Sequence, residues 1–327
     1  MPLIESTFTA PPLLANSHLQ TILPNFFRKV KDIEYIRERV ITYDSDFLDL
    51  DYVLNDSSSL AIISHGMEGS SNGQYVLGMA RYFSQRGWDI LAWNYRGCSG
   101  ELNQLGRFYH SGETTDLDFV INHALSTKSY KRVALIGFSL GGNITLKYLG
   151  EMGANAMPEI IGAVTFSTPC HLATGAKVLN LGKNKLYQTN FLMTLKVKLF
   201  QKYRKGLAKN IDIKKALLCR SLEEYDNVVT APLHGFKGAL DYYEQSSSIN
   251  YLADIKVPSL LVNAKDDPII SKESFPIELA KQSEHFYLET PPNGGHVGFS
   301  RVNLKRDLWS EKRAWQFISA HGLKREN

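Results

Sequence analysis

The sequence predicts an α/β fold in which a mostly parallel central sheet is flanked by helices. Short apolar runs alternate along the chain with segments of helical periodicity, which is the pattern of βαβ units. The runs are apolar at successive positions rather than at every second one, as expected for strands buried on both faces. A chain of 327 residues, 43% hydrophobic and 21% charged, is long enough to bury such a core.

An antiparallel hairpin is expected first, at residues 33–54, where apolar and polar residues alternate around a Tyr-Asp-Ser-Asp turn. Buried strands and helices then follow each other. The expected strands are Leu60–Ser64, Asp89–Tyr95, Arg132–Phe138, Ile160–Phe166, Ser259–Ala264 and His285–Glu289. The expected helices lie near residues 74–85, 115–125, 142–149, 273–282 and 304–320.

A long insertion separates the strand that ends at Phe166 from the strand that begins at Ser259. It spans about 90 residues, whereas a plain crossover needs about a dozen or more. We interpret approximately residues 170–250 as a helical cap inserted into one domain that covers residues 1–327. No repeat of 20 to 50 residues is found, which argues against solenoids and propellers.

The positive charge is concentrated in one part of the chain. The net charge is +4, but residues 171–220 contain twelve Lys/Arg and a single acid, Asp212. Charge segregated in this way often faces a partner, although a solvated basic helix is the ordinary explanation.

Three cysteines, Cys98, Cys170 and Cys219, are too few for a disulfide framework and fit no zinc spacing. We therefore expect a reducing compartment, the cytoplasm. The N-terminal residues lack the features of a signal peptide, and no apolar stretch of 18 residues predicts a membrane span.

A nucleophile is predicted at Ser139. Residues 137–141 read Gly-Phe-Ser-Leu-Gly, which fits the G-x-S-x-G pattern, and they lie between the expected strand Arg132–Phe138 and a helix. In that context the serine occupies a sharp turn that exposes its hydroxyl above the sheet. A tight turn in another α/β protein, or a nucleotide-binding loop, is the alternative, but no G-x-G-x-x-G or Walker pattern is present.

A serine hydroxyl needs a base within hydrogen-bond reach, and we assign this role to His296. His296 lies just past the last strand in a glycine-rich loop that can bring the imidazole onto the strand tips. The acid should follow the preceding strand, where Asp266 and Asp267 are adjacent. We choose Asp267, three residues past Ala264, and keep Asp266 as the alternative.

The oxyanion formed on attack requires backbone N–H donors. Leu140, directly after the nucleophile, and Met67, in the loop after the first parallel strand, are the candidates.

Taken together these residues resemble the α/β-hydrolase superfamily, and within it the YheT-like hydrolase branch. The stretches that carry the resemblance are His18-Leu19-Gln20-Thr21, His65-Gly66 with Gly69, Asn94-Tyr95-Arg96-Gly97-Cys98, Tyr109-His110-Ser111-Gly112, Gly137–Asn143, Asp266-Asp267-Pro268 and Gly294–Phe299. The resemblance implies a Ser/Asp/His triad and esterase or lipase-like chemistry on carboxylic esters.

The expected cap contains a basic segment with an apolar stripe of Phe191, Leu192, Leu195 and Leu199. We interpret the stripe as the underside of a lid that lines an acyl pocket. Lys196, Lys198 and Lys202 are then expected to face water. A basic helix with an apolar face can also lie on an anionic membrane surface, which is the alternative.

The sequence thus predicts a serine esterase that uses Ser139, His296 and Asp267 on a small-molecule acyl ester. An acyltransferase on the same triad and a non-catalytic acyl-binding protein are the alternatives. The histidines show no paired ligand spacing, so we expect neither a metal nor another cofactor. A pI of 8.7 is modest and no nucleic-acid-binding module is recognised, so no nucleic-acid partner is expected.

Overall fold

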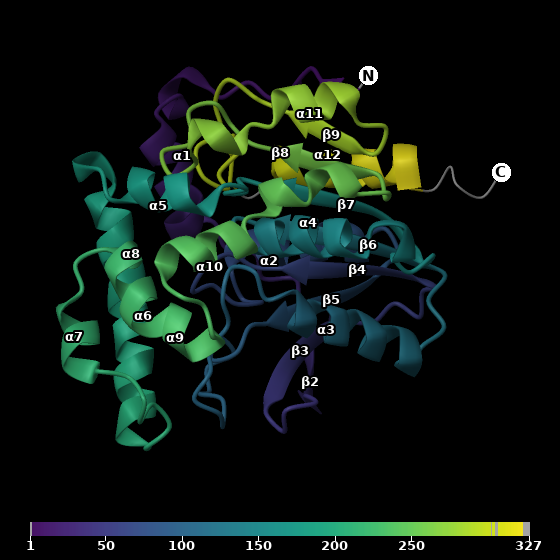
Figure 1. Ribbon diagram of the computed structural model, residues 1–327. Coiled ribbons are helices and arrows are strands. Elements are labelled where there is room, and N and C mark those ends of the chain that lie inside the picture. The colour runs from purple at the N-terminus through teal and green to yellow at the C-terminus, as the bar shows by residue number, and fades with distance from the viewer. Residues whose placement is uncertain (1, 302, 305–306, 323–327) are drawn as a thin grey trace.

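The computed structural model describes residues 2–301, 303–304 and 307–322. Within them, nine strands form one sheet in the order β1-β9-β8-β7-β6-β4-β5-β3-β2 (Figure 1). The strands are β1 (Leu3–Ile4), β2 (Ile36–Ile41), β3 (Phe47–Val53), β4 (Ser59–Ser64), β5 (Asp89–Asn94), β6 (Arg132–Phe138), β7 (Ile160–Phe166), β8 (Ser259–Val262) and β9 (Phe286–Glu289). Of the strand pairs in the described part of the chain, β2–β3 and β3–β5 alone are antiparallel. The predicted mostly parallel sheet is confirmed, and so is the hairpin at its edge.

Helices cover both faces of the sheet. Helices α3 (Thr114–Thr127), α4 (Leu140–Met152) and α11 (Ile277–Gln282) pack on one face, and α2 (Gln74–Ser84) and α12 (Trp309–Phe317) pack on the other. The sequence of strand β4 is continuously apolar because both of its faces are covered. Leu60 and Ile62 belong to one hydrophobic cluster, whereas Ala61 and Ile63 belong to the cluster on the opposite face.

Two predicted helices differ from the structure. The helix expected at residues 273–282 is divided by Pro276 into a short 3-10 turn (Lys272–Ser274) and α11, because a proline disrupts a helix interior. The helix expected at residues 304–320 begins at Trp309 and continues as a π-helical turn, Ile318–Gly322. Residues 305–306 of that prediction lie outside the described residues.

The sequence did not predict helix α1 (Ser17–Phe27). Its start is marked by Asn16, whose side chain accepts hydrogen bonds from the N–H groups of His18 and Leu19. Its large apolar residues do not mark a buried face, since Phe26 and Phe27 are 74% and 68% exposed. The buried residues of α1 are Gln20, Thr21 and Pro24, so hydrophobicity does not identify the face that packs inward.

Residues 167–258, between β7 and β8, form a mainly helical segment that we call the insert. It contains α5 (Leu172–Leu179), α6 (Lys185–Arg204), α7 (Ile213–Leu218), α8 (Leu222–Tyr225), α9 (Ala231–His234) and α10 (Ala239–Ser246). Helices α6–α9 lie beside the sheet, at the left in Figure 1. Leu192, Leu199 and Tyr225 belong to a hydrophobic cluster formed mainly by the insert, which keeps these helices together.

The predicted apolar stripe of α6 is divided between two environments: Phe191 and Leu195 line a pocket together with Ser139, whereas Leu192 and Leu199 pack within the insert. Leu192 and Leu199 are buried. The expectation that Lys196, Lys198 and Lys202 face water is wrong. The Lys196 ammonium group donates to the carbonyl oxygens of Leu217 and Cys219. That of Lys198 binds the Glu68 carboxylate. That of Lys202 donates to the carbonyl oxygens of Leu105 and Arg107. Backbone carbonyls and one carboxylate from other segments thus take the place of water, and burial lowers the pKa of Lys202 to about 8.

No helix among the described residues combines the length and the apolar composition that crossing a bilayer requires.

Candidate active site

Ser139 occupies a strained turn between β6 and α4. Its backbone has φ 53° and ψ −119°, a conformation that costs energy for any residue with a Cβ. The glycines of the motif make the turn possible. A Cβ at Gly141 would lie 2.4 Å from the carbonyl oxygen of Ser64, and one at Gly137 would lie 2.6 Å from the carbonyl oxygen of Gly141. Strand and helix can approach this closely only with glycine at both positions.

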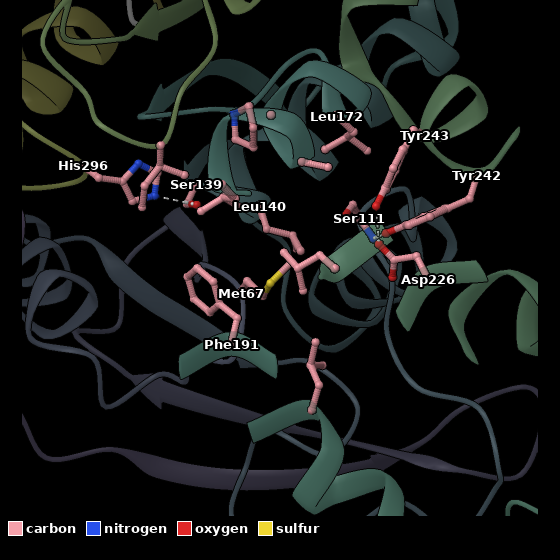
Figure 2. Close-up of a pocket in the computed structure, with 17 residues that line it drawn as sticks. Met67, Ser111, Ser139, Leu140, Leu172, Phe191, Asp226, Tyr242, Tyr243 and His296 are labelled. Carbon is pink, nitrogen blue, oxygen red and sulfur yellow. Dashed lines mark hydrogen bonds between the residues drawn. The ribbon is translucent and has the colours of Figure 1, made fainter. Parts of the chain in front are cut away.

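His296 reaches the serine from the loop that follows β9. Its Nε2 lies 2.9 Å from Ser139 Oγ (Figure 2). The loop is held from two sides. The His296 N–H donates to Thr21 Oγ1 over 2.9 Å, and the Val297 N–H donates to Ser167 Oγ over 2.8 Å. Gly295 and Val297 both have positive φ, so the backbone on each side of the imidazole is tightly turned.

The structure brings Asp267, and not Asp266, to the imidazole. Asp267 Oδ2 lies 2.9 Å from His296 Nδ1, and Oδ1 accepts the backbone N–H groups of Ile269 and Ile270 at 2.9 and 3.2 Å. Asp266 instead accepts the Gly295 N–H over 3.0 Å, and burial raises the pKa of its carboxyl. One aspartate orients the histidine ring, while its neighbour supports the histidine's loop.

The direction of these bonds suits a general base. A carboxylate accepts only, so Asp267 keeps the imidazole proton on Nδ1 and leaves the Nε2 lone pair facing the Ser139 hydroxyl. This arrangement can remove the hydroxyl proton as the oxygen attacks an electrophile.

The two expected oxyanion donors lie at the same place. Met67 and Leu140 line one pocket together with Ser139 and His296. Gly66 packs so closely that a Cβ on it would lie 3.3 Å from Ser139 Cβ. Leu140 is the first residue of α4, where helix geometry leaves the backbone N–H without an intrahelical acceptor.

His65 supports this loop from inside the protein. Its Nδ1 lies 2.7 Å from the Gly66 carbonyl oxygen, and its Nε2 accepts the Tyr95 N–H over 3.2 Å. Burial lowers the pKa of His65 to about 3, so the ring is neutral at ordinary pH. We infer a structural role for this histidine.

Sequence reasoning assigned no role to Gln20 and Thr21 of α1, although both hold the His296 loop. Besides the Thr21 contact, Gln20 Nε2 donates to the Ser300 carbonyl oxygen over 3.1 Å, and its Oε1 accepts the Ser300 N–H over 2.9 Å. The only signal in the sequence was their position in the His18–Thr21 stretch of the family resemblance.

The pocket beside Ser139 is walled mainly by apolar side chains. They come from the strand ends, from α4 and from the insert: Met67, Leu140, Pro169, Leu172, Leu179, Phe191, Leu195, Leu222 and Ile269. Ser111, Asp226, Tyr242 and Tyr243 line it as well. The pocket can therefore accommodate an apolar chain next to the reactive hydroxyl.

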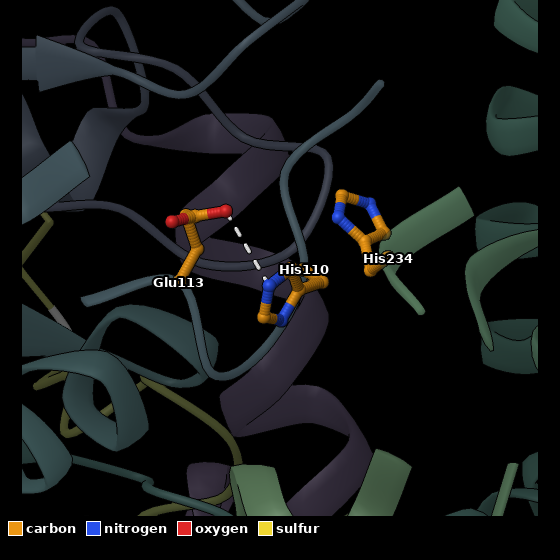
Figure 3. A group of neighbouring side chains, drawn as sticks. All are labelled: His110, Glu113 and His234. Carbon is orange, nitrogen blue, oxygen red and sulfur yellow. Dashed lines mark ion pairs between the residues drawn. The ribbon is translucent and has the colours of Figure 1, made fainter. Parts of the chain in front are cut away.

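A second group of side chains, His110, Glu113 and His234, has ligand-type atoms within 4.8 Å of one another (Figure 3). His110 Nε2 lies 3.3 Å from Glu113 Oε2, and the Arg107 guanidinium binds the same carboxylate oxygen. His110 Nδ1 accepts the Gly112 N–H, which places the ring proton on Nε2, toward Glu113. The carboxylate is thus already neutralised and the imidazole already hydrogen-bonded. These bonds do not suit a metal ion, and we assign none there.

Comparisons with known proteins agree with this architecture. The family model described as alpha/beta hydrolase fold matches residues 62–300. The chain is 33% identical over 317 residues to YheT of Escherichia coli (strain K12), covering 94% of this chain and 91% of that one. It is 28% identical over 339 residues to phospholipase ABHD3 of Mus musculus, covering 100% of this chain and 82% of that one.

Among solved structures, the esterase Pf2001 of Pyrococcus furiosus superimposes with a TM-score of 0.60 at 18% identity, covering 97% of this chain and 99% of that one. At that identity the likeness concerns the fold alone. The sequence relatives and the family model together confirm the resemblance to the YheT-like branch. The chain belongs to the α/β-hydrolase fold family.

Proposed function

We propose that this protein is a serine hydrolase that cleaves carboxylic esters through an acyl-enzyme. The observation that carries the proposal is the continuous hydrogen-bonded series Asp267–His296–Ser139 at the wall of an apolar pocket. The names of its relatives support it, since they include a phospholipase and a monoacylglycerol lipase of Saccharomyces cerevisiae.

In this mechanism Ser139 Oγ attacks the acyl carbonyl carbon while His296 Nε2 takes its proton. Asp267 stabilises the resulting imidazolium without taking the proton itself. The N–H groups of Met67 and Leu140 hold the oxyanion. The tetrahedral intermediate then collapses, the alcohol leaves with the proton from His296, and the acyl group stays on Ser139. Water repeats the sequence and releases the acid.

The substrate class follows from the pocket. The apolar walls favour an ester with an apolar acyl chain, and buried apolar surface contributes about 25 cal/mol per Å² to binding. Leu172, Leu179, Phe191 and Leu195, all from the insert, form part of these walls. The insert, which contains the predicted cap at approximately residues 170–250, thus acts as the cap of a single hydrolase domain.

The test uses a fluorophosphonate probe together with a chain-length series of nitrophenyl esters. Ser139→Ala should lose both labelling and hydrolysis, whereas Ser126→Ala, at an exposed serine of α3, should keep both. Undiminished labelling of Ser139→Ala would refute the assignment. The alternative is acyl transfer to an alcohol. If added glycerol or ethanol changes the product from the free acid to a new ester, the acyl-enzyme favours transfer to alcohols.

The surface of the insert supports contact with an anionic lipid. Leu186, Met193, Val197 and Phe200 of α6 are exposed by 44–71%, and their spacing of seven, four and three residues places them on one side of the helix. The exposed basic residues of this region are Lys177, Lys183, Lys185, Arg204, Lys205, Lys209, Lys214, Lys215 and Arg220. Apolar residues combined with cations are typical of helices that lie on anionic membranes.

We therefore expect the protein to sediment with anionic vesicles and not with neutral ones, and salt should weaken the binding. Equal sedimentation with both kinds of vesicle would exclude this contact. The cytoplasm is the proposed compartment, because Cys98, Cys170 and Cys219 are buried and free of disulfides.

A further inference from the structure

The pocket beside Ser139 has a polar end as well as a reactive one. Figure 2 shows Asp226, Tyr242, Tyr243 and Ser111 gathered on the opposite side of the pocket from Ser139 and His296. Asp226 comes from the turn that follows α8, and the tyrosines come from α10. Both elements belong to the insert, so it shapes the pocket with polar as well as apolar groups.

The Asp226 carboxylate is held in a fixed position. Its Oδ1 accepts the Thr230 hydroxyl over 2.6 Å, and its Oδ2 accepts the Tyr243 hydroxyl over 2.7 Å. Tyr242 completes the group, since its hydroxyl oxygen accepts the Ser111 N–H over 2.8 Å.

Among the described residues, the hydrogen bonds to this carboxylate leave part of its acceptor capacity unused. A carboxylate offers about four lone-pair positions, and two hydroxyl donors occupy two of them. In the described part of the chain no cation is paired with Asp226. The neighbours that influence its titration are Thr230, Tyr243 and Glu223. Desolvation by burial raises the pKa of this carboxyl to about 6, the direction expected for an acid that lacks a counter-charge.

An apolar chain that ended at this carboxylate would displace water from it and supply no hydrogen bond. Binding of such a chain is disfavoured, because a desolvated acceptor without a hydrogen bond costs free energy. A group with an N–H or O–H would satisfy it. Such a donor is compatible with the rest of the pocket. Leu140 and Leu172, which lie between the two ends in Figure 2, require only that the connecting part of the ligand be apolar.

Building on the proposed esterase function, we propose that Asp226 and Tyr242 form a subsite for a hydrogen-bond donor at the end of the substrate remote from the scissile ester. The preferred substrates are then esters with three parts: the ester group at Ser139, an apolar spacer, and a hydroxyl or ammonium group at the far end. Asp226 is a specificity-determining residue in this arrangement.

The experiment compares matched nitrophenyl esters at several acyl lengths, each as the plain, the ω-hydroxy and the ω-amino acyl compound. At the length that spans the pocket, kcat/KM of the wild type should be about tenfold higher for a donor-bearing ester than for the plain one. Asp226→Leu should reverse this preference. Asp226→Asn keeps a hydrogen-bonding group without the charge, so it should lose an ω-amino preference and keep part of an ω-hydroxy preference. Glu244→Gln, at an exposed acid of α10 that does not line the pocket, should leave the ratios unchanged.

The outcomes separate this subsite from the esterase function itself. If the wild type cleaves plain esters and its preference for donors stays below about twofold at every length, the subsite is refuted and the esterase proposal stands. That wild-type comparison holds even if Asp226→Leu does not fold. If the wild type cleaves no ester at any length, both proposals fall together.

Discussion

Lys198 Nζ of helix α6 lies 3.0 Å from Glu68 Oε1, and this ion pair joins the insert to the loop that contains Met67. The Lys198 and Glu68 side chains are 19% and 5% exposed, so the pair is largely shielded from solvent. Glu68 has a positive φ of 56°, and Tyr109 binds both its carboxylate and its N–H at 2.8 Å. The insert therefore contributes to the shape of the loop on which one proposed oxyanion donor depends.

Replacing Lys198 should slow catalysis more than it weakens substrate binding. We expect Lys198→Met to lower kcat about tenfold with little change in KM, because a loosened Met67 N–H stabilises the oxyanion less well. Lys198→Arg, which can keep the ion pair, should retain most of the activity. Lys209→Met is the control at an exposed lysine of the insert. An unchanged kcat in a folded Lys198→Met protein would show that the loop does not need this contact.

The two adjacent aspartates should respond very differently to amidation. Asp267→Asn removes the charge that fixes the His296 tautomer, and we expect kcat to fall by about 10³- to 10⁴-fold. Asp266→Asn weakens only the contact with the Gly295 N–H and should cost less than about tenfold. Steady-state kinetics of both variants, with circular dichroism to confirm folding, make the comparison. Similar losses in the two variants would contradict the assignment of Asp267.

Gly141→Ala should destabilise the fold as well as the site. The new Cβ would lie 2.4 Å from the Ser64 carbonyl oxygen, a backbone atom that cannot move away cheaply. We expect a loss of about 3 kcal/mol in the free energy of unfolding, measured by urea denaturation. Gly182→Ala is a suitable control, because nothing lies within 4 Å of a Cβ there. Equal stability of the two variants would mean that the turn has more room than the structure shows.

The Asp226 carboxyl should make the free energy of unfolding depend on pH. Burial raises its pKa from 3.8 to about 6, so folding favours the protonated form. Its contribution to stability is therefore complete below about pH 4 and is lost as the pH rises through about 6. Asp226→Asn cannot ionise, and relative to wild type it should gain about 2 kcal/mol of unfolding free energy between about pH 4 and pH 7. The measurement is urea denaturation at both pH values. Parallel profiles for the two proteins would contradict the raised pKa.

The order of elements was predictable because local signals agree with the final packing. Strand β6, the Ser139 turn and α4 follow one another within residues 132–152, and the glycines that the turn requires are part of the same short motif. For the aspartate pair, local sequence left two candidates. Only the packing of the Gly294–Gly295 turn against Asp266 separates the roles of the two carboxylates.

Contacts between distant segments could not be predicted. Thr21 and His296 are 275 residues apart, and nothing in the sequence near either residue indicates that they meet. The lysines of α6 show a second limit of local patterns. Helical periodicity assigns a charged side chain to the solvent, whereas here carbonyl groups from α7 and from the loop at residues 105–107 receive two of the ammonium groups.

The hydrogen bonds from Gln20 and Thr21 have a practical consequence for anyone who shortens this protein. The family match covers residues 62–300, and a fragment with those limits would keep all three proposed catalytic side chains. It would lack helix α1, the clamp on the loop that presents the imidazole. Such a fragment would retain Ser139, Asp267 and His296, but the loop that carries His296 would lose its hydrogen bonds to α1. The family model thus spans less of the chain than the hydrogen bonds that hold the His296 loop in place.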